Sequence, residues 1–515
     1  MSDRETVKDL ARWALALDAK SLPASVLQQT KLLVLDSIGC ALATLDEEEP
    51  MEAVHAIQSL GGAPQCTIVG SAQKTSVTNA VLANGILVRY LDLNDFGIAR
   101  DAGGKGAPGI GGHPSDNIPV GLTVGEWQKS SGLDVIAAIV MGYQLYDRFK
   151  DINDRDQPWD GTSSAGLVAT AMAGRLMKLD QETLAHALAL GAARCVTPGI
   201  MRSGKVSAAK FLSNPLVAQS GVTATVLAAG GMTGPLAVLD HPQGIPSLFK
   251  NGDATPLAAP YSKDFAIIDS NMKAYPCLAT GQAIVAAGIE MHKVLRGRVD
   301  NIRSIEVYMA DNPFVRRQQD DQDRRFPNSR EAADHSFYFL AVAAIVDGKL
   351  TPRSFDNRRW TQPNIDGLMK KTAMMTDPGL NAKAPTGYPC AIRVVTADGK
   401  DYRTEVAYAP GFSHGGLKES EVIEKFDMVT ESALTAAERK KIKETVGRLE
   451  TLRSVADLMK LVAGKPRTAK AKARPKAKAK AKAKAKAKAT TKVKAKAKAR
   501  PKAKRKTTAR SKRKA

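Results

Sequence analysis

The chain has 515 residues and a formal net charge of +23, but the charge is concentrated at one end. Of its 75 Lys and Arg residues, 25 lie in residues 465–515, which contain no Asp or Glu, so residues 1–464 hold 50 basic and 52 acidic residues. Residues 1–464, the body of the protein, therefore have a net charge of −2. The positive charge of the whole chain gives no information about the function of this body.

Five scattered cysteines form no C-x-x-C pair, which predicts a reducing compartment without a disulfide framework and gives no local signature of an iron–sulfur cluster. The N-terminal residues 1–17 form an amphipathic pattern with acidic residues rather than a signal peptide. No uninterrupted apolar run reaches the roughly 18 residues typical of a membrane span. We therefore expect a soluble cytoplasmic protein without a membrane segment.

Helical periodicity dominates the first half of the chain. Three helices are predicted within residues 1–60, and another apolar helical run covers 80–91. Later helices are predicted near 118–128, 133–150, 164–178 and 181–195, followed by a long helix after Lys210. Small residues in these helices favour close packing in a bundle.

A glycine-rich segment between two of these helices combines several polar groups. It follows Asp92 and Asp95, and it ends in His113, Ser115 and Asp116. Carboxylates, an imidazole and a helix N-terminus brought together suit acid–base work on a carboxylate-bearing substrate. The structural alternative is that the first two aspartates end one helix and that Ser115 or Asp116 caps the next.

The pattern changes after a proline-rich, irregular stretch at 232–262. Alternating strands are predicted at 265–270, 302–310 and in a hairpin formed by 391–397 and 402–408, with helices near 280–293, 334–347 and 363–372 between them. The predicted fold is mostly α, with a large all-helical domain and a smaller α+β domain. The predicted domains are 1–264, helical; 265–410, α+β; 411–464, a helical segment that packs back on the first domain; and 465–515, a tail.

Lys and Ala alternate through much of the tail, which has no aromatic residue and almost no large apolar one. Such a composition cannot bury enough apolar surface to fold, so we expect residues 465–515 to be disordered. The polycation should bind nucleic acid or another polyanion without sequence preference. The alternative is a functionally neutral extension.

Several separate motifs, in order, resemble the MmgE/PrpD family, which includes 2-methylcitrate dehydratases and cis-aconitate decarboxylases. The likeness extends from about residue 5 to about residue 464. It is carried by R-x-L-D-x-N-D at 89–95, GHPSDNIP at 112–119, the stretch 174–195, Lys210 with 221–235, KAYP at 273–276, 334–350 and 410–426.

The resemblance implies an active site without metal or cofactor, formed by Asp92, His113, Lys210 and Lys273. His113 would be the general acid or base, because an imidazole titrates near neutral pH, and Asp92 would orient it or act as its partner. The two lysines would hold substrate carboxylates, although Lys210 by itself would read as a solvated surface residue. Further substrate-binding residues would be Asp95, Ser115, Arg202, Tyr275 and His335.

Asp334-His335 matches the dehydratase branch of the family, although it could simply cap the apolar helix that follows. The expected reaction is dehydration of a 2-methylcitrate-like hydroxy acid by a homodimer with its site between the helical and α+β domains. The alternatives are a decarboxylase or epimerase on the same fold, or a weakly catalytic scaffold whose tail binds nucleic acid. The chain departs from the family pattern at Phe96, where a Thr is frequent, and at 159–162 and near Thr280, where the family carries histidines.

Overall fold

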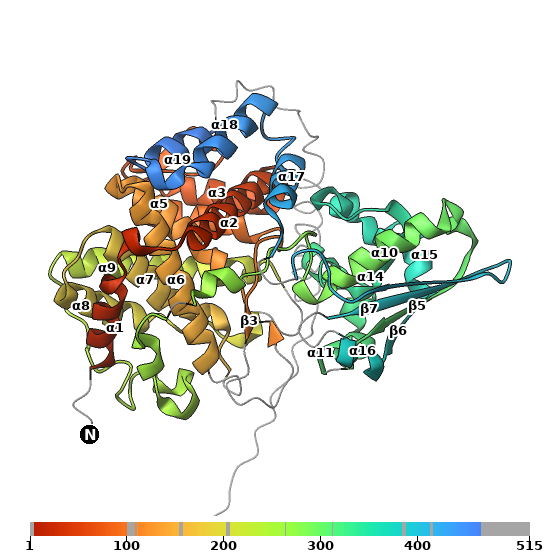
Figure 1. The fold of residues 1–515 in the computed structure, drawn as a ribbon, viewed down its shortest axis with the longest axis horizontal. Helices are drawn as coiled ribbons and strands as arrows, with labels where there is room; N and C mark the ends of the chain where they lie inside the picture. The colour runs from red at the N-terminus through yellow and green to blue at the C-terminus, as the bar shows by residue number, and fades with distance from the viewer. Residues whose placement is uncertain are drawn as a thin grey trace, which may run out of the picture. The chain divides into compact units, whose positions relative to one another are not determined.

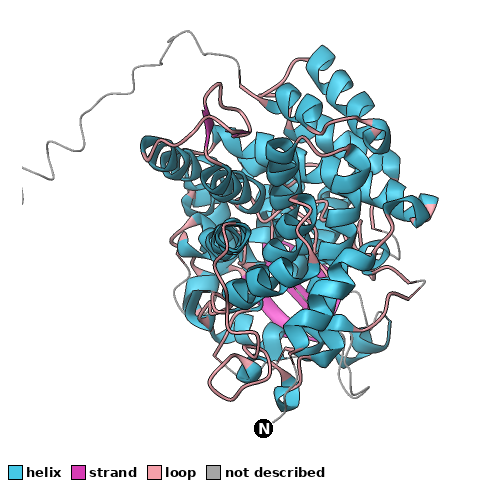
Figure 2. Cartoon of the chain, turned by 90° about the vertical axis from the view of Figure 1, so that its left-hand side faces the viewer, coloured by secondary structure: helices cyan, strands magenta, loops and turns pink. Residues whose placement is uncertain are grey.

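The computed structural model describes residues 5–99, 109–110, 112–153, 158–201, 207–262, 264–311, 313–383, 388–412 and 416–464. The predicted disordered tail, Arg202 and most of the glycine-rich segment lie outside the described residues. Figure 2 shows that helices make up most of the described chain. The prediction of a mostly α fold with a smaller α+β part is confirmed.

The first half of the chain is a helical assembly around one large hydrophobic core (Figure 1). Glycines allow its helices to approach closely: a Cβ on Gly191 would lie 2.2 Å from Thr170 Oγ1, and one on Gly221 would lie 3.0 Å from the same atom. The helices are α1 (Thr6–Ala16), α2 (Ala24–Ala43), α3 (Glu48–Ser59), α4 (Val77–Arg89), α5 (Ile118–Gln128), α6 (Gly132–Ile152), α7 (Ala165–Leu176), α8 (Gln181–Ala192) and α9 (Ala209–Ala229).

Helix α2 and the short turn after it, Ala24–Asp46, are long and apolar enough to cross a membrane by length and composition. However, 83% of the most apolar window is buried inside the protein. Its apolar side chains pack into the core of the helical assembly, which is the burial expected of a central helix in a globular fold.

A second core lies between a four-stranded sheet and the helices that cover one face of it. The strand order is β6-β5-β7-β8; β5 pairs with β6 in parallel and with β7 antiparallel, and β7 pairs antiparallel with β8. The strands are β5 (Ile302–Met309), β6 (Thr372–Thr376), β7 (Cys390–Thr396) and β8 (Asp401–Val406); the main helices are α10 (Gln282–Leu295), α14 (Phe337–Asp347) and α15 (Pro363–Lys370).

Shorter helices complete this region, and three helices follow it. Apolar residues of the last three helices belong to the same core as the N-terminal helices, and α17 packs against α2. The predicted domain boundaries nevertheless remain predictions. The shorter helices are α11 (Pro313–Asp320), α12 (Gln322–Arg325), α13 (Arg330–Ala333) and α16 (Pro378–Lys383); the last three are α17 (Glu419–Val429), α18 (Ala436–Gly447) and α19 (Ala456–Val462).

One local prediction in the α+β region was wrong, and one strand of its sheet was missed. The alternating segment 265–270 is a 3₁₀ turn, Ala266–Asp269, that packs against α2 and α6; the Ala266 N–H donates to Gln144 Oε1 instead of to a neighbouring strand. The helix predicted near 363–372 is confirmed as α15, but β6, which begins at Thr372 and pairs with β5, was not predicted. Whether a segment finds a strand partner depends on residues distant in sequence.

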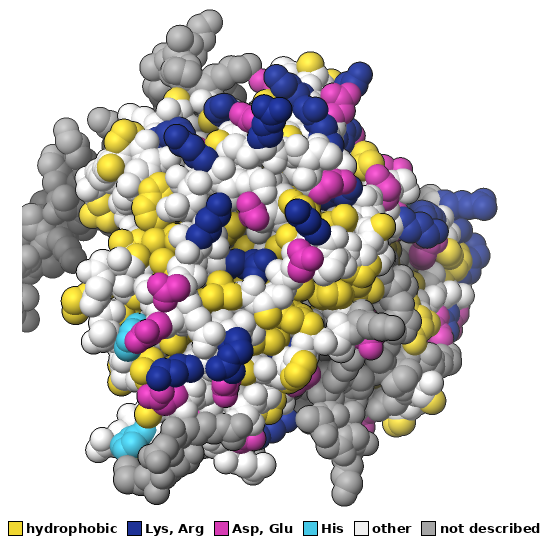
Figure 3. Space-filling view, turned by 60° about the vertical axis from the view of Figure 1, so that its left-hand side comes forward, with side chains coloured by type: hydrophobic (Ala, Val, Ile, Leu, Met, Phe, Trp, Pro, Cys, Tyr) yellow, Lys and Arg dark blue, Asp and Glu magenta, His cyan; other side chains and the backbone are white. Residues whose placement is uncertain are grey.

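The surface of the body reflects its near-neutral composition. Figure 3 shows Lys and Arg interspersed with Asp and Glu on the face that it displays, with apolar side chains between them. This mixture matches the net charge of −2 that the sequence gives for residues 1–464. The described residues on this face therefore mix both signs of charge and do not form a single-sign field that would steer a polyanion.

Candidate active site

Asp92 lies at the centre of a buried cluster of charged side chains. Helix α4 ends at Arg89, and three residues later Asp92 adopts a left-handed backbone conformation with φ of 50°. This conformation is uncommon for residues other than glycine, although Asp and Asn adopt it more readily than most. It places the carboxylate in the interior, where Asp92 is only 2% exposed.

Three cations from different parts of the chain contact this carboxylate. Arg89 Nη1 donates to Asp92 Oδ1 at 2.5 Å, and Lys210 Nζ, in the first turn of α9, donates to Oδ2 at 3.2 Å. Lys273 Nζ donates to Oδ1 and to the Asp92 carbonyl, each at 2.7 Å. Burial alone would raise the pKa of Asp92, but the charges of Lys210, Lys273 and Arg89 outweigh burial and hold it well below its ordinary value. Asp92 therefore stays ionised.

Two imidazoles lie beside the Asp92 carboxylate, one near each of its oxygens. His113 Nε2 lies 3.7 Å from Oδ1, and His335 Nε2 lies 3.6 Å from Oδ2. His113 Nδ1 is 2.6 Å from the carbonyl oxygen of Asp95; because a carbonyl only accepts, Nδ1 is the donor and Nε2 is directed at the carboxylate. The site thus holds two groups of the type that transfers protons near neutral pH.

The second imidazole is part of a dyad with its neighbour in sequence. His335 Nδ1 hydrogen-bonds to Asp334 Oδ1, and Lys210 Nζ lies 3.1 Å from His335 Nε2. Burial and the charge of Lys210 lower the pKa of His335 to about 4, although Asp334 opposes them. Burial would raise the pKa of Asp334, but Lys210 and His335 lower it below its ordinary value. The resting dyad is therefore a neutral imidazole on a carboxylate.

A second buried aspartate supports the cluster from behind. Asp95 accepts hydrogen bonds from the Ser115 N–H at 3.0 Å, from Tyr143 Oη at 2.8 Å and from Ser270 Oγ at 2.5 Å. Burial raises the pKa of Asp95 in spite of these hydrogen bonds. Because its side-chain oxygens accept hydrogen bonds from these three donors, Asp95 holds the segment that carries His113 in place.

The alternative that Ser115 or Asp116 caps the helix after the loop was wrong. The N-cap of α5 is Asn117, which makes no capping bond with its side chain. Ser115 Oγ and Asp116 Oδ1 instead accept hydrogen bonds from Asn94 Nδ2 at 2.9 and 2.8 Å. These two residues therefore tie the two ends of the glycine-rich segment together.

The structure brings most of the predicted site residues together. Asp92, His113, Lys210 and Lys273 meet directly, and His335 joins them. Tyr275 packs against the core of the α+β region, and its backbone binds the Gln282 side chain. Arg202 lies outside the described residues. Whether these residues bind or convert substrate stays a prediction.

Sequence reasoning missed three members of this network. Arg89 belongs to the R-x-L-D-x-N-D run and lies one helical turn before Asp92, so its i,i+3 spacing was an available signal. Tyr143 in α6 and Ser270 both reach Asp95 from positions far along the chain. No local pattern marks these two residues as partners of an aspartate.

Asp92, Asp334 and His335 each offer a ligand atom within 4.8 Å of the others, which is the spacing of a metal site. Lys210 Nζ, however, lies 3.2 Å from Asp92 Oδ2 and 3.1 Å from His335 Nε2. A metal ion among these atoms would meet the ammonium at short range and repel it. The donor set therefore does not fit a divalent cation while Lys210 is charged.

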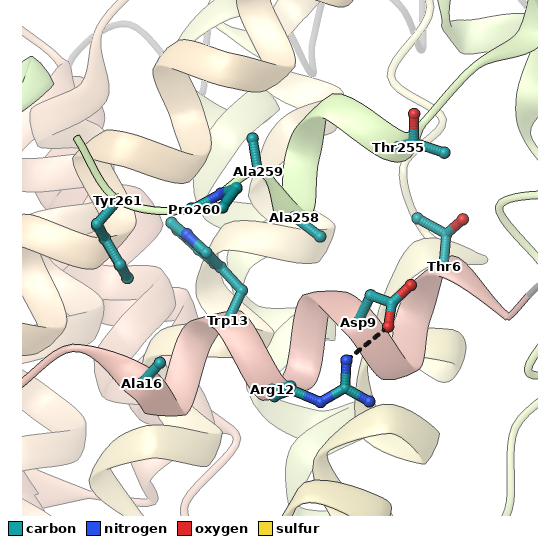
Figure 4. A pocket seen from close by; sticks show the side chains of 10 residues that line it. All are labelled: Thr6, Asp9, Arg12, Trp13, Ala16, Thr255, Ala258, Ala259, Pro260 and Tyr261. Atoms are coloured by element: carbon teal, nitrogen blue, oxygen red, sulfur yellow. Dashed lines mark hydrogen bonds and ion pairs between the residues drawn. The ribbon is translucent and has the colours of Figure 1, made fainter.

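A separate cavity of about 410 Å³ opens between α1 and residues 255–261 (Figure 4). It is lined by Trp13 and Tyr261, with the Asp9–Arg12 ion pair beside it. Its lining contains no histidine or lysine and shares no residue with the Asp92 cluster. Its lining therefore lacks the proton-transfer groups that distinguish the Asp92 cluster.

Two family models match the chain. The MmgE/PrpD N-terminal domain matches residues 8–257, and the MmgE/PrpD C-terminal domain matches residues 275–451. These two matches cover all the predicted site residues except Lys273. Lys273 lies between the two matched segments.

Curated relatives match at low identity over most of the chain. A cis-aconitate decarboxylase-like protein of Aspergillus oryzae is 23% identical, covering 89% of this chain and 97% of its own length. The cis-aconitate decarboxylase of Mus musculus is 25% identical, covering 87% and 91%. A probable 2-methylcitrate dehydratase of Saccharomyces cerevisiae is 23% identical, covering 72% and 74%.

Proposed function

The chain belongs to the MmgE/PrpD family of enzymes that act on small carboxylic acids, and we propose that it is a carbon–oxygen lyase that dehydrates a 2-methylcitrate-like hydroxy acid. The observation that carries this proposal is the Asp92 cluster, in which two lysines and two imidazoles surround one buried carboxylate.

Dehydration removes a proton beside a carboxylate and expels the hydroxyl from the adjacent carbon. The first change builds negative charge on the substrate carboxylate, and the second needs a proton for the departing oxygen. Lys210 and Lys273 are buried cations, only 3% and 0% exposed. The low local dielectric therefore strengthens their attraction for substrate carboxylates. The imidazoles supply groups that accept and donate protons.

Decarboxylation of a cis-aconitate-like acid is the second candidate, and the names of the Aspergillus and mouse relatives favour it. It needs the same carboxylate-binding lysines and a proton donor for the carbon that loses carbon dioxide. Proton NMR of 2-methylcitrate, citrate and cis-aconitate incubated with the protein separates the two reactions. Absence of product from all three acids would contradict both. The homodimer and the cytoplasmic location stay predictions.

Chelators are expected to leave turnover unchanged. Lys210 already supplies positive charge at the place where a cation would bind the clustered side chains. The check is the initial rate before and after prolonged dialysis against EDTA and 1,10-phenanthroline, with a mock-dialysed sample as the control. Loss of activity that returns on addition of iron or another divalent ion would contradict the metal-free proposal.

The tail supports a separate, accessory function. Residues 465–515 carry 25 positive charges and no negative ones, whereas the body is nearly neutral. The tail has no aromatic side chain for stacking on bases, so we propose that it binds the phosphates of duplex nucleic acid without sequence preference.

Truncation after Gly464 is expected to abolish binding to duplex DNA and to leave lyase turnover unchanged. Binding by the full chain should weaken steeply with salt, because each neutralised phosphate releases counterions. Fluorescence anisotropy with two unrelated duplexes at several salt concentrations checks this. Equal DNA binding by both proteins would contradict the role of the tail, and lost turnover would contradict the independence of the body.

A further inference from the structure

The two imidazoles that flank Asp92 differ in the charge beside the ring and in the partner of Nδ1. Both Nε2 atoms lie near the Asp92 carboxylate, at 3.7 Å for His113 and 3.6 Å for His335, so this contact does not distinguish them. Lys210 Nζ lies 3.1 Å from His335 Nε2 and 3.4 Å from its Nδ1, so the positive charge disfavours a second proton on this ring. Nδ1 of His335 binds the Asp334 carboxylate, whereas Nδ1 of His113 binds the Asp95 carbonyl.

Asp334 completes this asymmetry. It accepts from His335 Nδ1 and fixes the tautomer in which Nε2 is the acceptor. Asp334 is fully buried, and Lys210 contributes to keeping it ionised through a lowered pKa. The backbone carbonyl of Asp95 fixes the ring of His113 in the same way but adds no full negative charge.

We propose that His335, positioned by Asp334, is the catalytic base of this site and that His113 is the acid. This assignment rests on the proposed dehydration. His335 Nε2 takes the proton from the carbon beside a substrate carboxylate, and the electrons of that C–H bond form the new double bond. The C–O bond to the neighbouring carbon breaks, and its oxygen leaves as water with the proton of His113. Both rings then exchange protons with solvent and return to their starting states.

Substrate binding would switch the base on. Burial and Lys210 keep the pKa of His335 near 4, where an imidazole is a weak base. A substrate carboxylate on Lys210 offsets that positive charge and withdraws the ammonium from Nε2, so the ring becomes more basic when substrate is present. Asp92 and Asp334 act in the same direction. Four charged or polar side chains contact His335. Lys210 of α9, Asp92 after α4 and the adjacent Asp334 lie beside the His335 ring, and Gln318 of α11 donates to the His335 carbonyl.

The first test replaces each ring by glutamine in the full-length protein. His335→Gln is expected to lower kcat on the hydroxy acid that the wild type converts by about 10²–10⁴-fold, the usual contribution of a positioned acid or base, with a smaller change in KM. His55→Gln is the matched control, because His55 is exposed on α3 and should leave kcat unchanged. Thermal melts of each variant confirm that the fold is retained.

A chloride analogue separates the base from the acid. Chloride departs without a proton, so when chloride replaces the hydroxyl, elimination needs the base and not the acid. His113→Gln should eliminate chloride at close to the wild-type rate, whereas His335→Gln should stay slow. The reverse pattern, or equal loss in both variants, would overturn the assignment of the two roles.

Asp334→Asn tests the positioning role. Removing the negative charge lowers the pKa of His335 further, so the acid side of the kcat–pH profile should move to lower pH while the maximum rate falls. The titration of the substrate is the same in both proteins, so the difference reports on the dyad. A reduced rate with an unmoved profile would make Asp334 merely structural and would overturn its proposed role.

Failure of the assignment and failure of the proposed function give different results. A wild-type enzyme that dehydrates a hydroxy acid and a His335→Gln variant within threefold of it would overturn the base while leaving dehydration intact. A wild type that releases carbon dioxide from cis-aconitate and leaves hydroxy acids unchanged would overturn both, because that reaction needs a proton donor and no C–H base.

Discussion

Asp92→Asn is expected to lower both stability and turnover more than any other single substitution in the site. The change leaves Arg89, Lys210 and Lys273 close together in the interior without the carboxylate that neutralises them. Removing one partner of a buried ionic group typically costs about 3–5 kcal/mol. Asparagine adopts the left-handed backbone of this position as readily as aspartate, so the substitution tests the charge rather than the turn.

The pH dependence of this effect has a defined sign. The pKa of Asp92 is lower in the folded protein than its ordinary value of 3.8, so its ionised form stabilises the folded state. This contribution is fully present well above 3.8 and is lost as the pH falls below 3.8 towards the folded pKa. The stability difference between wild type and Asp92→Asn should therefore be constant near neutral pH and shrink in acid.

Denaturant unfolding at several pH values measures this difference. Glu126→Gln is a matched control: Glu126 is also a buried carboxylate paired with a lysine, Lys74, but it lies near the end of α5. It should lose stability while keeping turnover per folded molecule. An Asp92→Asn variant as stable as the wild type would contradict the account of the cluster.

His113→Gln is expected to abolish most of the turnover while the fold remains intact. The imidazole is 7% exposed, and its hydrogen bond to the Asp95 carbonyl can be replaced by the amide of glutamine. The loss should be about 10²–10⁴-fold in kcat if His113 transfers a proton. His186→Gln is the control. The His186 ring is half-buried on α8, so this substitution measures the effect of removing a partly packed histidine outside the site.

Steady-state kinetics on the hydroxy acid, together with a thermal melt, check this prediction. Near-wild-type kcat in His113→Gln would remove His113 from the mechanism. A melt shifted as far as that of Asp92→Asn would show that the ring is needed for folding instead. Unchanged kinetics of His186→Gln would confirm that the loss belongs to the site.

The helical half was predictable because its signals are local. Residues 118–128, for example, were predicted to be a helix and form α5 with the same bounds. Strands β5, β7 and β8 were also predictable, because alternation and the short connection of the 391–397 and 402–408 hairpin are short-range features. The sequence could not show that 266–269 lacks a pairing partner or that β6 has one, because pairing is decided by the tertiary fold.

The site divides in the same way. Asp92, His113, Lys210 and Lys273 came from motifs, and the structure shows how they meet around one carboxylate. The contributions of Tyr143 and Ser270 depend on contacts across long stretches of chain. The asymmetry of the two imidazoles depends on the position of the Lys210 ammonium to within an ångström or so, which no spacing in the sequence encodes.

The most direct test of the central claim is a proton NMR time course of wild type, His113→Gln and His335→Gln with 2-methylcitrate, citrate and cis-aconitate. The account predicts that the wild type converts a hydroxy acid into an unsaturated acid, with the loss of the proton on the carbon beside the departing hydroxyl, and that both variants are slow. Wild-type rates in both variants, or no conversion of any of these acids by the wild type, would contradict the assignment of acid–base lyase chemistry to the Asp92 cluster.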